Sequence, residues 1–164
     1  MRIIVAVSKS WAIGKDNKLL FSLKEDMKFF RQTTSGKVVV MGKNTYLSLP
    51  KRPLKDRVNI VLTKENFGDG SITVKDMDEL FAEISKHDTD DVYVIGGASM
   101  YRQMLPYCDI ALITKVDADS EADTYFTNLD ELSSWQCVEE SKAEDTLPIT
   151  FCTYKNNDVK EYKQ

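Results

Sequence analysis

Short apolar runs alternate with amphipathic segments over the first two-thirds of the chain, and this alternation constrains the fold more than any other feature. The predicted strands are Ile3–Ser8, Lys37–Met41, Arg57–Thr63, Ser71–Val74 and Val92–Ile95. The predicted helices between and after them are Lys24–Thr34, Thr45–Leu49, Met77–Ser85 and Ser99–Leu105. Strands that alternate with helices pair in parallel, and their continuous apolar character suits a sheet covered on both faces.

The pattern changes after Pro106, where three strand candidates follow without helices between them: Asp109–Val116, Gln136–Glu140 and Thr150–Tyr154. Such strands predict an antiparallel edge to the sheet. The polar stretch Lys9–Leu23 is predicted as one long loop. The polar residues 156–164 are expected to fray, which leaves a single domain over residues 1–155 and a polar C-terminal tail.

Composition excludes several classes of protein. The 164 residues are 42% hydrophobic and carry a net charge of −4, which disfavours nucleic acid or an anionic membrane as the main partner. No apolar run approaches the roughly 18 residues of a membrane span, and the first apolar run is interpreted as a strand rather than a signal peptide. The three cysteines (Cys108, Cys137 and Cys152) form no CxxC pair, so a reducing cytosol is expected and neither a disulfide framework nor a structural zinc site is indicated.

Two glycine segments at strand ends are candidate phosphate sites. Gly42-Lys43-Asn44-Thr45 fails the P-loop pattern, because Lys37 stands where a glycine is required and Asn44 where a serine or threonine is required. The backbone N–H groups of a helix start can still hold a phosphate, although a simple helix cap by Asn44 or Thr45 explains the segment equally well. Gly96-Gly97-Ala98-Ser99 also precedes a helix and does not match GxGxxG, so it is either a ligand-approach turn or an ordinary turn.

Other motifs favour structural explanations. The acidic run that begins at Asp117 lacks the glycine and glutamate of a calcium loop, with Ala122 and Asn128 at those positions, so no metal site is predicted. His87 lies in a polar loop that offers no nucleophilic partner. Asp26 lies in the first turns of the predicted helix Lys24–Thr34, beside Met27 and Phe30, which are both expected to face inward. Its carboxylate is either a helix N-terminal charge, which the local sequence favours, or a buried functional group.

In their order along the chain, these motifs resemble those of the chromosomal-type dihydrofolate reductase family, from about Arg2 to Tyr154. The segments that carry the resemblance are Ala12-Ile13-Gly14 with Asn17, Asp26-Met27 with Phe30, Met41–Thr45, Arg52-Pro53-Leu54 with Arg57-Val58-Asn59, Ile95–Ala98 with Tyr101, and Asp123–Phe126. The resemblance implies an α/β fold with a central eight-stranded, mostly parallel sheet, an antiparallel C-terminal strand and four flanking helices. It also implies a cis peptide between Gly96 and Gly97.

The resemblance further implies an NADPH-dependent enzyme that reduces 7,8-dihydrofolate to tetrahydrofolate for one-carbon metabolism. Ionised Asp26 would be the catalytic residue, oriented by Thr114, and would accept two hydrogens from the amidine edge of the pterin. Arg57 would hold the carboxylate of the glutamate tail. The implied substrate-binding residues are Ile4, Val5, Ala6, Asp26, Met27, Phe30, Leu49, Leu54, Arg57, Ile95, Tyr101 and Thr114.

On the cofactor side, Lys43 and Lys64 would attract the extra ribose phosphate of NADPH, and the Lys9–Leu23 loop would close over the site. The implied cofactor-binding residues are Ala6, Ile13, Gly14, Leu19, Gly42, Lys43, Asn44, Thr45, Leu62, Thr63, Lys64, Ile95, Gly96, Gly97, Ala98, Ser99, Met100, Tyr101, Gln103 and Thr124. Two departures stand out: Leu20-Phe21 replaces the family's usual Pro-Trp, and Ala98 replaces a third glycine.

The family implies a cytoplasmic monomer that antifolates inhibit. Two alternatives remain at this point: a related pterin or pyrimidinone reductase of the same fold, and a nucleotide-binding protein without turnover. The combination of Asp26 with Arg57 favours folate, because the two side chains would bind its pterin ring and its glutamate tail.

Overall fold

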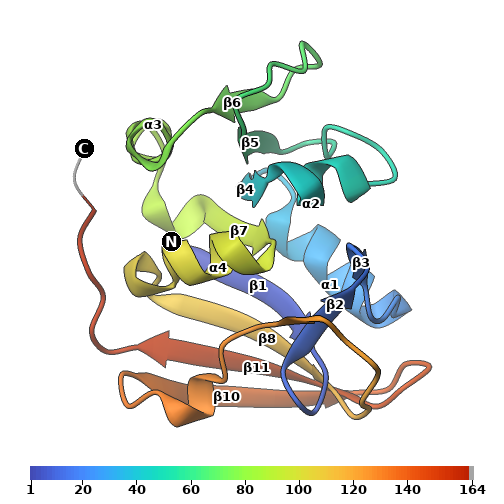
Figure 1. Ribbon diagram of the computed structural model, residues 1–164. Coiled ribbons are helices and arrows are strands. Elements are labelled where there is room, and N and C mark those ends of the chain that lie inside the picture. The colour runs from blue at the N-terminus through green and yellow to red at the C-terminus, as the bar shows by residue number, and fades with distance from the viewer. Residues whose placement is uncertain (163–164) are drawn as a thin grey trace.

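The computed structural model describes residues 1–162 and contains one large, mostly parallel sheet (Figure 1). Its parallel strands are β1 (Arg2–Val7), β4 (Val38–Gly42), β5 (Val58–Leu62), β6 (Ile72–Val74), β7 (Val92–Gly96) and β8 (Ile110–Val116). Two further strands, β10 (Trp135–Ala143) and β11 (Ile149–Asn156), complete the order β10-β11-β8-β1-β7-β4-β5-β6. The predicted eight-stranded architecture is confirmed.

The C-terminal hairpin forms the antiparallel part of the sheet. β11 pairs antiparallel with both β8 and β10, as the change of pattern after Pro106 predicted. Both hairpin strands are longer than predicted, because cross-strand pairing continues through polar residues as far as Ala143 opposite Ile149. The register shifts between Cys137 and Glu139, so β10 carries a bulge.

Four α-helices flank the sheet, as predicted: α1 (Lys24–Thr34), α2 (Lys43–Ser48), α3 (Met77–Ile84) and α4 (Ala98–Met104). Short 3₁₀ helices occur at η1 (Thr89–Asp91), η2 (Leu105–Tyr107) and η3 (Leu129–Glu131). The start of α3 is fixed by Asp76, whose side chain accepts a hydrogen bond from the N–H of Glu79 at 2.9 Å.

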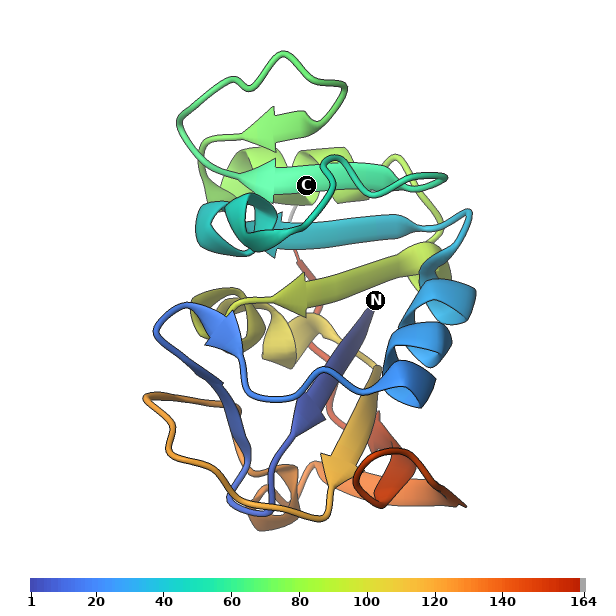
Figure 2. The same cartoon turned by 90° about the vertical axis from the view of Figure 1, so that its right-hand side faces the viewer.

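Side-chain alternation along β4 explains why both faces of the sheet are covered. Val38 and Val40 belong to the large core that includes Leu80 of α3 and Met104 of α4. Val39 and Met41 point the other way and pack with Tyr46 of α2 in a separate cluster. Figure 2 views the sheet from the side of α1 and α2. A strand buried on both faces must be apolar throughout, which is the pattern that the sequence shows.

The stretch Lys9–Leu23 is more regular than the long loop that the sequence predicted. It contains β2 (Ala12–Lys15) and β3 (Lys18–Leu19), which pair with β9 (Thr124–Tyr125) in a second sheet of order β3-β2-β9. The hairpin turns at Asp16 and Asn17, whose φ angles are 52° and 61°. Asp and Asn tolerate this left-handed conformation better than other residues that carry a side chain. The prediction missed the hairpin because its strands are too short to show an apolar period.

The C-terminal residues lie against the molecule as far as Tyr162, so the expected fraying is wrong for the described part of the tail. The N–H of Lys160 donates to the carbonyl of Pro106 at 2.9 Å. The ring of Tyr162 stacks on Phe81 with 5.0 Å between centroids. Across residues 1–162, no helix has both the length and the apolar character needed to cross a bilayer.

Candidate active site

Two strand–helix junctions lie side by side at the carboxyl ends of two neighbouring strands. β4 leads through Gly42 into α2, and β7 leads through Gly96 and Gly97 into α4. Because β4 and β7 are parallel neighbours with Met41 opposite Gly96, both helices begin at the carboxyl ends of these strands. The two glycine segments that the sequence singled out therefore meet in space.

The glycine pair is required by its surroundings. Gly96 has a φ of 134°, and a Cβ there would lie 3.2 Å from Oγ1 of Thr45 on α2. A Cβ on Gly97 would lie 3.4 Å from the same oxygen. The peptide between the glycines is cis, as the family resemblance implied, and Arg52–Pro53 is a second cis peptide that was not predicted. The absence of a Cβ at both positions therefore lets Thr45 pack closely against this turn.

Asp26 lies half-buried in the first turn of α1. Burial raises the pKa of its carboxyl group, the hydroxyl of Thr114 lowers it by hydrogen bonding, and the charge of Asp145 raises it. Thr114 lies on β8 opposite Ala6 of β1, so the central strands present this hydroxyl to the carboxylate. Of the two explanations for Asp26 that the sequence left open, the buried functional group fits these surroundings better than a solvated helix charge.

Tyr101 links Asp26 to the glycine pair. Its hydroxyl donates a hydrogen bond to the carbonyl of Ile4 at 3.0 Å. A Cβ on Gly96 would lie 3.6 Å from the same hydroxyl. Burial, and secondarily the charge of Asp26, raise the pKa of Tyr101 well above its ordinary value, so the phenol stays protonated. Residues from β1, α1, β7 and α4 therefore converge at one place.

An apolar wall and a cation adjoin this place. Leu49, Leu54 and Ile95 are partly buried and pack on the cluster that contains Tyr46. The guanidinium of Arg57 lies 5.9 Å from the ring centre of Phe30, and its Nε donates to the carbonyl of Lys55 at 2.9 Å. No carboxylate within residues 1–162 forms an ion pair with Arg57. Its Nη1 also donates to Oγ1 of Thr34 at 3.3 Å. The guanidinium donors beyond these two contacts are available to an external carboxylate.

Two predicted site residues are oriented differently from expectation. Met27 is 57% exposed, so the prediction that it faces inward is wrong. Asp26 and Phe30 are four residues apart and share a face of α1, whereas Met27 is turned about 100° away from Asp26. Leu19, on the edge strand β3, is 85% exposed and does not pack on the site in this structure.

The other predicted cofactor residues lie around the two junctions and the nearby sheet. Lys43 forms an ion pair with Glu65, whereas Lys64 has no ion-pair partner among residues 1–162. The amide of Gln103 donates to the hydroxyl of Ser99 at 2.9 Å. Ile13 and Met100 are buried, Asn44 and Ser99 are exposed, and the half-buried residues are Val5, Ala6, Leu62, Thr63, Ala98 and Thr124. Gly14 is buried, and a Cβ on it would lie 3.0 Å from the carbonyl of Lys18 and 3.7 Å from Thr124.

Asn59 is a positioning residue to which the sequence assigned no role. It is 3% exposed on β5, and its amide group donates to and accepts from the backbone of Leu54 at 3.0 and 2.9 Å. This pair of hydrogen bonds fixes the segment that carries Leu54 and leads to Arg57. A polar side chain within an apolar strand was the signal that could have identified it.

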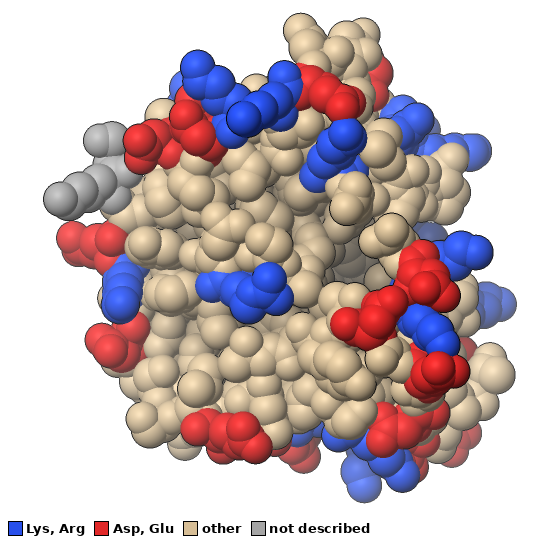
Figure 3. Space-filling model, in the orientation of Figure 1, with Lys and Arg blue, Asp and Glu red and all other residues tan. Residues whose placement is uncertain are grey.

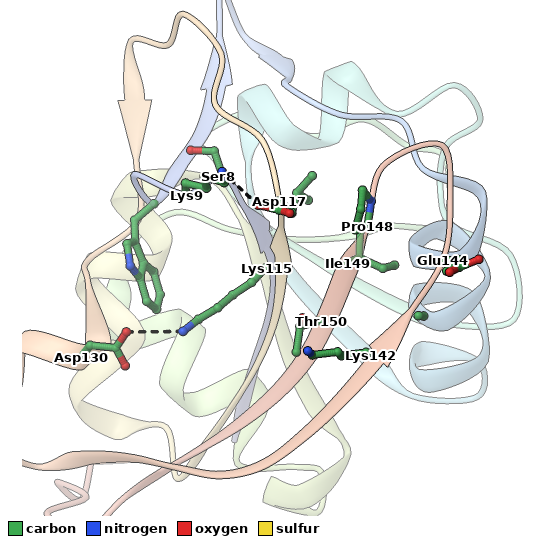
Figure 4. A pocket seen from close by; sticks show the side chains of 13 residues that line it. Ser8, Lys9, Lys115, Asp117, Asp130, Lys142, Glu144, Pro148, Ile149 and Thr150 are labelled. Carbon is green, nitrogen blue, oxygen red and sulfur yellow. Dashed lines mark hydrogen bonds and ion pairs between the residues drawn. The ribbon is translucent and has the colours of Figure 1, made fainter.

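A cavity of about 750 Å³ lies away from this site (Figure 4). It is bordered by β8, the β10–β11 hairpin and the segment Ser8–Trp11, and it contains none of the predicted substrate or cofactor residues. The surface is also hollowed between α2, α4 and the β2–β3 hairpin (Figure 3). The candidate active site is this second location, because both glycine junctions lie at these helix starts and Tyr101 connects them to the half-buried carboxylate of Asp26. Arg57 precedes β5 and so lies toward the opposite end of the parallel strands.

Comparison with known proteins agrees with this geometry. The family model for dihydrofolate reductase matches residues 1–156. A dihydrofolate reductase of Haemophilus influenzae is 37% identical over 127 residues, which cover 77% of this chain and 78% of that protein. One from Bacillus subtilis is 35% identical over 137 residues, covering 82% and 79%.

A solved structure described as dihydrofolate reductase from Enterococcus faecalis complexed with NADP(H) and RAB-propyl has a similar fold. It matches with a TM-score of 0.86 and 29% identity over 96% of each chain. Sequence, fold and site geometry lead to the same assignment, and the chain belongs to the dihydrofolate reductase family.

Proposed function

We propose that this protein catalyses the NADPH-dependent reduction of 7,8-dihydrofolate to 5,6,7,8-tetrahydrofolate. The observation that carries the proposal is the half-buried carboxylate of Asp26, which pairs with the hydroxyl of Thr114 and whose charge acts on Tyr101 beside the glycine pair. A nucleotide-binding protein without turnover would have no use for a desolvated carboxylate beside its glycine junctions. Family membership over residues 1–156 supports the same activity.

Asp26 binds and polarises the substrate in this proposal. An ionised carboxylate accepts two parallel hydrogen bonds from the ring N–H and the exocyclic amino group of the pterin. Partial burial strengthens that pairing, because water competes less for the carboxylate. Thr114 fixes its orientation, and Phe30, Leu49, Leu54 and Ile95 supply apolar surface for the rest of the substrate. Arg57, already held by the carbonyl of Lys55, binds the carboxylate of the glutamate tail.

The residues at the two junctions fit NADPH. The N–H groups at the adjacent starts of α2 and α4 would hold the pyrophosphate. Lys64, which has no ion-pair partner among the described residues, and Lys43 provide positive charge for the ribose phosphate. When bound, the cofactor supplies the hydride, and the protein aligns the two rings.

The β2–β3 hairpin closes over the reacting rings and excludes bulk water. Asp26 is the only carboxyl, amino or imidazole group assigned to the pterin ring, and the raised pKa of Tyr101 makes its phenol a poor acid. Water therefore supplies the proton to the imine nitrogen that accompanies hydride transfer. The protein acts as a monomer in the cytoplasm, and antifolates that carry an amidine edge compete for Asp26. The net charge of −4 argues against a nucleic-acid partner.

The loss of NADPH absorbance on addition of dihydrofolate tests the proposal directly. Saturable turnover with dihydrofolate, with a tail-less dihydropterin reduced less efficiently, is the expected result. Equal efficiency with both substrates would favour a related pterin reductase. Nucleotide binding without any turnover would favour the non-catalytic alternative.

A further inference from the structure

The bulge in β10 gathers three metal-ligating side chains on one face of the C-terminal hairpin, at the bottom edge of the sheet in Figure 1. Cys137 lies opposite Tyr154, and Glu140 lies opposite Cys152. Directly opposed residues share a face of the sheet, and residues two apart on one strand also share a face. Cys137 and Glu140 are three apart and would face opposite ways in a regular strand. The bulge removes that mismatch.

The spacing of the three side chains suits a small cation. The two sulfurs and a carboxylate oxygen of Glu140 all lie within 4.8 Å of one another. The Sγ of Cys137 is 3.7 Å from Oε1 of Glu140. Around a tetrahedral zinc ion, with Zn–S of about 2.3 Å and Zn–O of about 2.0–2.2 Å, neighbouring ligand atoms are about 3.5–3.8 Å apart. The sulfur of Cys137 and the oxygen of Glu140 are therefore already spaced as two ligands of one tetrahedral zinc ion.

We propose that Cys137, Glu140 and Cys152 form a binding site for a thiophilic divalent cation of the Zn²⁺ type, with water as the fourth ligand. Bound metal would link β10 to β11 and stabilise the edge of the sheet. The cysteine spacing argued against a structural zinc site, because Cys152 lies on a different strand from Cys137 and Glu140. The bulge that brings Cys137 and Glu140 to one face is also invisible in the spacing.

Charge and access around the cluster are consistent with a metal. Two thiolates, one carboxylate and a divalent cation sum to −1, and Lys115 supplies a nearby positive charge. Lys115 of β8 is close enough for its charge to act on both Cys137 and Cys152. Cys152 is buried, Cys137 is half-buried and Glu140 is exposed. The protein therefore covers one side of the site, and solvent reaches the other.

The third cysteine provides an internal comparison. Cys108 is buried at the end of η2, and its thiol donates to the carbonyl of Met104 at 3.3 Å. It belongs to no metal-ligating group among the described residues. The proposed metal site uses no residue of the candidate active site, so its occupancy can be measured independently of dihydrofolate reduction.

Titration of the reduced full-length protein with Cd²⁺ tests the proposal, because cadmium thiolates absorb in the ultraviolet. The expected result is a charge-transfer band that saturates at one equivalent. Cys137→Ser and Glu140→Gln should each weaken Cd²⁺ binding by about tenfold or more, since each removes a ligand. Glu139→Gln and Cys108→Ala are the matched controls and should bind as the wild type does. Both test positions are solvent-accessible, so the test avoids replacing the buried Cys152.

Thermal unfolding with Zn²⁺ gives a second readout. The melting temperature of the wild type should rise and then saturate, and Cys137→Ser should lose that rise. Equal Cd²⁺ affinity in the wild type and in both ligand variants would overturn the proposal, and so would a charge-transfer band that depends on Cys108. Absence of saturable metal binding would also overturn it, and formation of a Cys137–Cys152 disulfide under mild oxidant would then identify the two thiols as a redox pair instead.

Discussion

The carboxylate of Asp123 accepts a hydrogen bond from the backbone N–H of Asp16 at 2.9 Å. The N–H of Asp123 also donates to the carbonyl of Gly14 at 3.1 Å. These two contacts connect the segment before β9 to the turn of the β2–β3 hairpin. The hydrogen bond from Asp16 and a second from Thr124 lower the pKa of Asp123. The hydrogen bond from Asp16 to ionised Asp123 therefore stabilises the fold at pH values above the usual carboxyl range. This stabilisation is lost as pH falls through the lowered pKa of Asp123.

Asp123→Ala should loosen the hairpin and slow hydride transfer severalfold, because the variant removes the acceptor that holds Asp16. Faster amide hydrogen exchange over residues 12–19 should accompany the slower rate. Glu121→Gln is the control, since it removes only the exposed ion pair with Lys15. Unchanged exchange and unchanged hydride transfer in Asp123→Ala would show that the hairpin is held in another way.

Cofactor preference should depend more on Lys64 than on Lys43. Lys43 is already neutralised by Glu65, whereas Lys64 has no such partner among residues 1–162. An exposed charge contributes about 0.2–1 kcal/mol, so Lys64→Ala should reduce the NADPH over NADH preference by up to about fivefold. Glu65→Gln should increase that preference by releasing Lys43, and added salt should diminish both effects. Ratios of kcat/KM for the two cofactors provide the measurement, and equal discrimination in Lys43→Ala/Lys64→Ala would assign both lysines to surface solvation.

Arg57 should discriminate between substrates with and without a glutamate tail. Arg57→Ala should raise the KM for dihydrofolate and leave the KM for a tail-less dihydropterin nearly unchanged. Arg57→Lys should recover only part of the loss, because lysine cannot form the paired guanidinium contacts. A similar loss for both substrates would mean that Arg57, through its contacts with Phe30 and Thr34, chiefly supports the fold.

Elements with a long apolar period were predictable from the sequence, and elements fixed by distant contacts were not. The continuous apolar run of β4 determines its burial on both faces, and α1 has the predicted bounds. The β2–β3 hairpin depends on pairing with β9 from the other end of the chain. The exposure of Met27 depends on how α1 is rotated against the sheet, which the local pattern does not specify.

The same distinction holds for the candidate active site. The glycine junctions were visible as strand–glycine–helix segments, and the parallel pairing of β4 with β7 brings them together. The local sequence of Asp26 favoured an ordinary helix charge, and only its position facing Thr114 of β8 indicates otherwise. The cysteine cluster was unpredictable, because it requires both the register of the C-terminal hairpin and its bulge.

Phe21 occupies the position where the family usually has tryptophan. It packs partly buried on a cluster formed by Leu23, Val116 and Ile149. Phe21→Trp adds an N–H donor and should change the rate or apparent pKa of the proton-coupled step more than it changes NADPH affinity. Leu20→Pro/Phe21→Trp should also slow product release, because proline restricts the backbone beside the hairpin. The rate of single-turnover hydride transfer, measured across pH for wild type and Phe21→Trp, tests this prediction. Superimposable rate profiles, with a change only in stability, would mean that Phe21 serves only in packing.

Asp26→Asn should separate catalysis from folding stability. Burial raises the pKa of Asp26 in the folded protein, so ionised Asp26 opposes folding above the usual carboxyl range. The Asn variant should therefore be at least as stable as the wild type at neutral pH, and this advantage should vanish below the ordinary carboxyl pKa. Melting temperatures at the two pH values provide the check, and a less stable variant at neutral pH would contradict the argument.

If ionised Asp26 polarises the pterin, the rate of hydride transfer from NADPH to dihydrofolate depends on its charge, and Asp26→Asn measures that dependence. Loss of a buried charged hydrogen-bond partner costs about 2–5 kcal/mol, so the rate at pH 7 should fall by a factor of about 30 to several thousand. The deficit should shrink in acid, where the substrate is already protonated, and Glu25→Gln should behave as the wild type does. Near-native hydride transfer by Asp26→Asn at pH 7 would mean that the reaction does not need the ionised carboxylate.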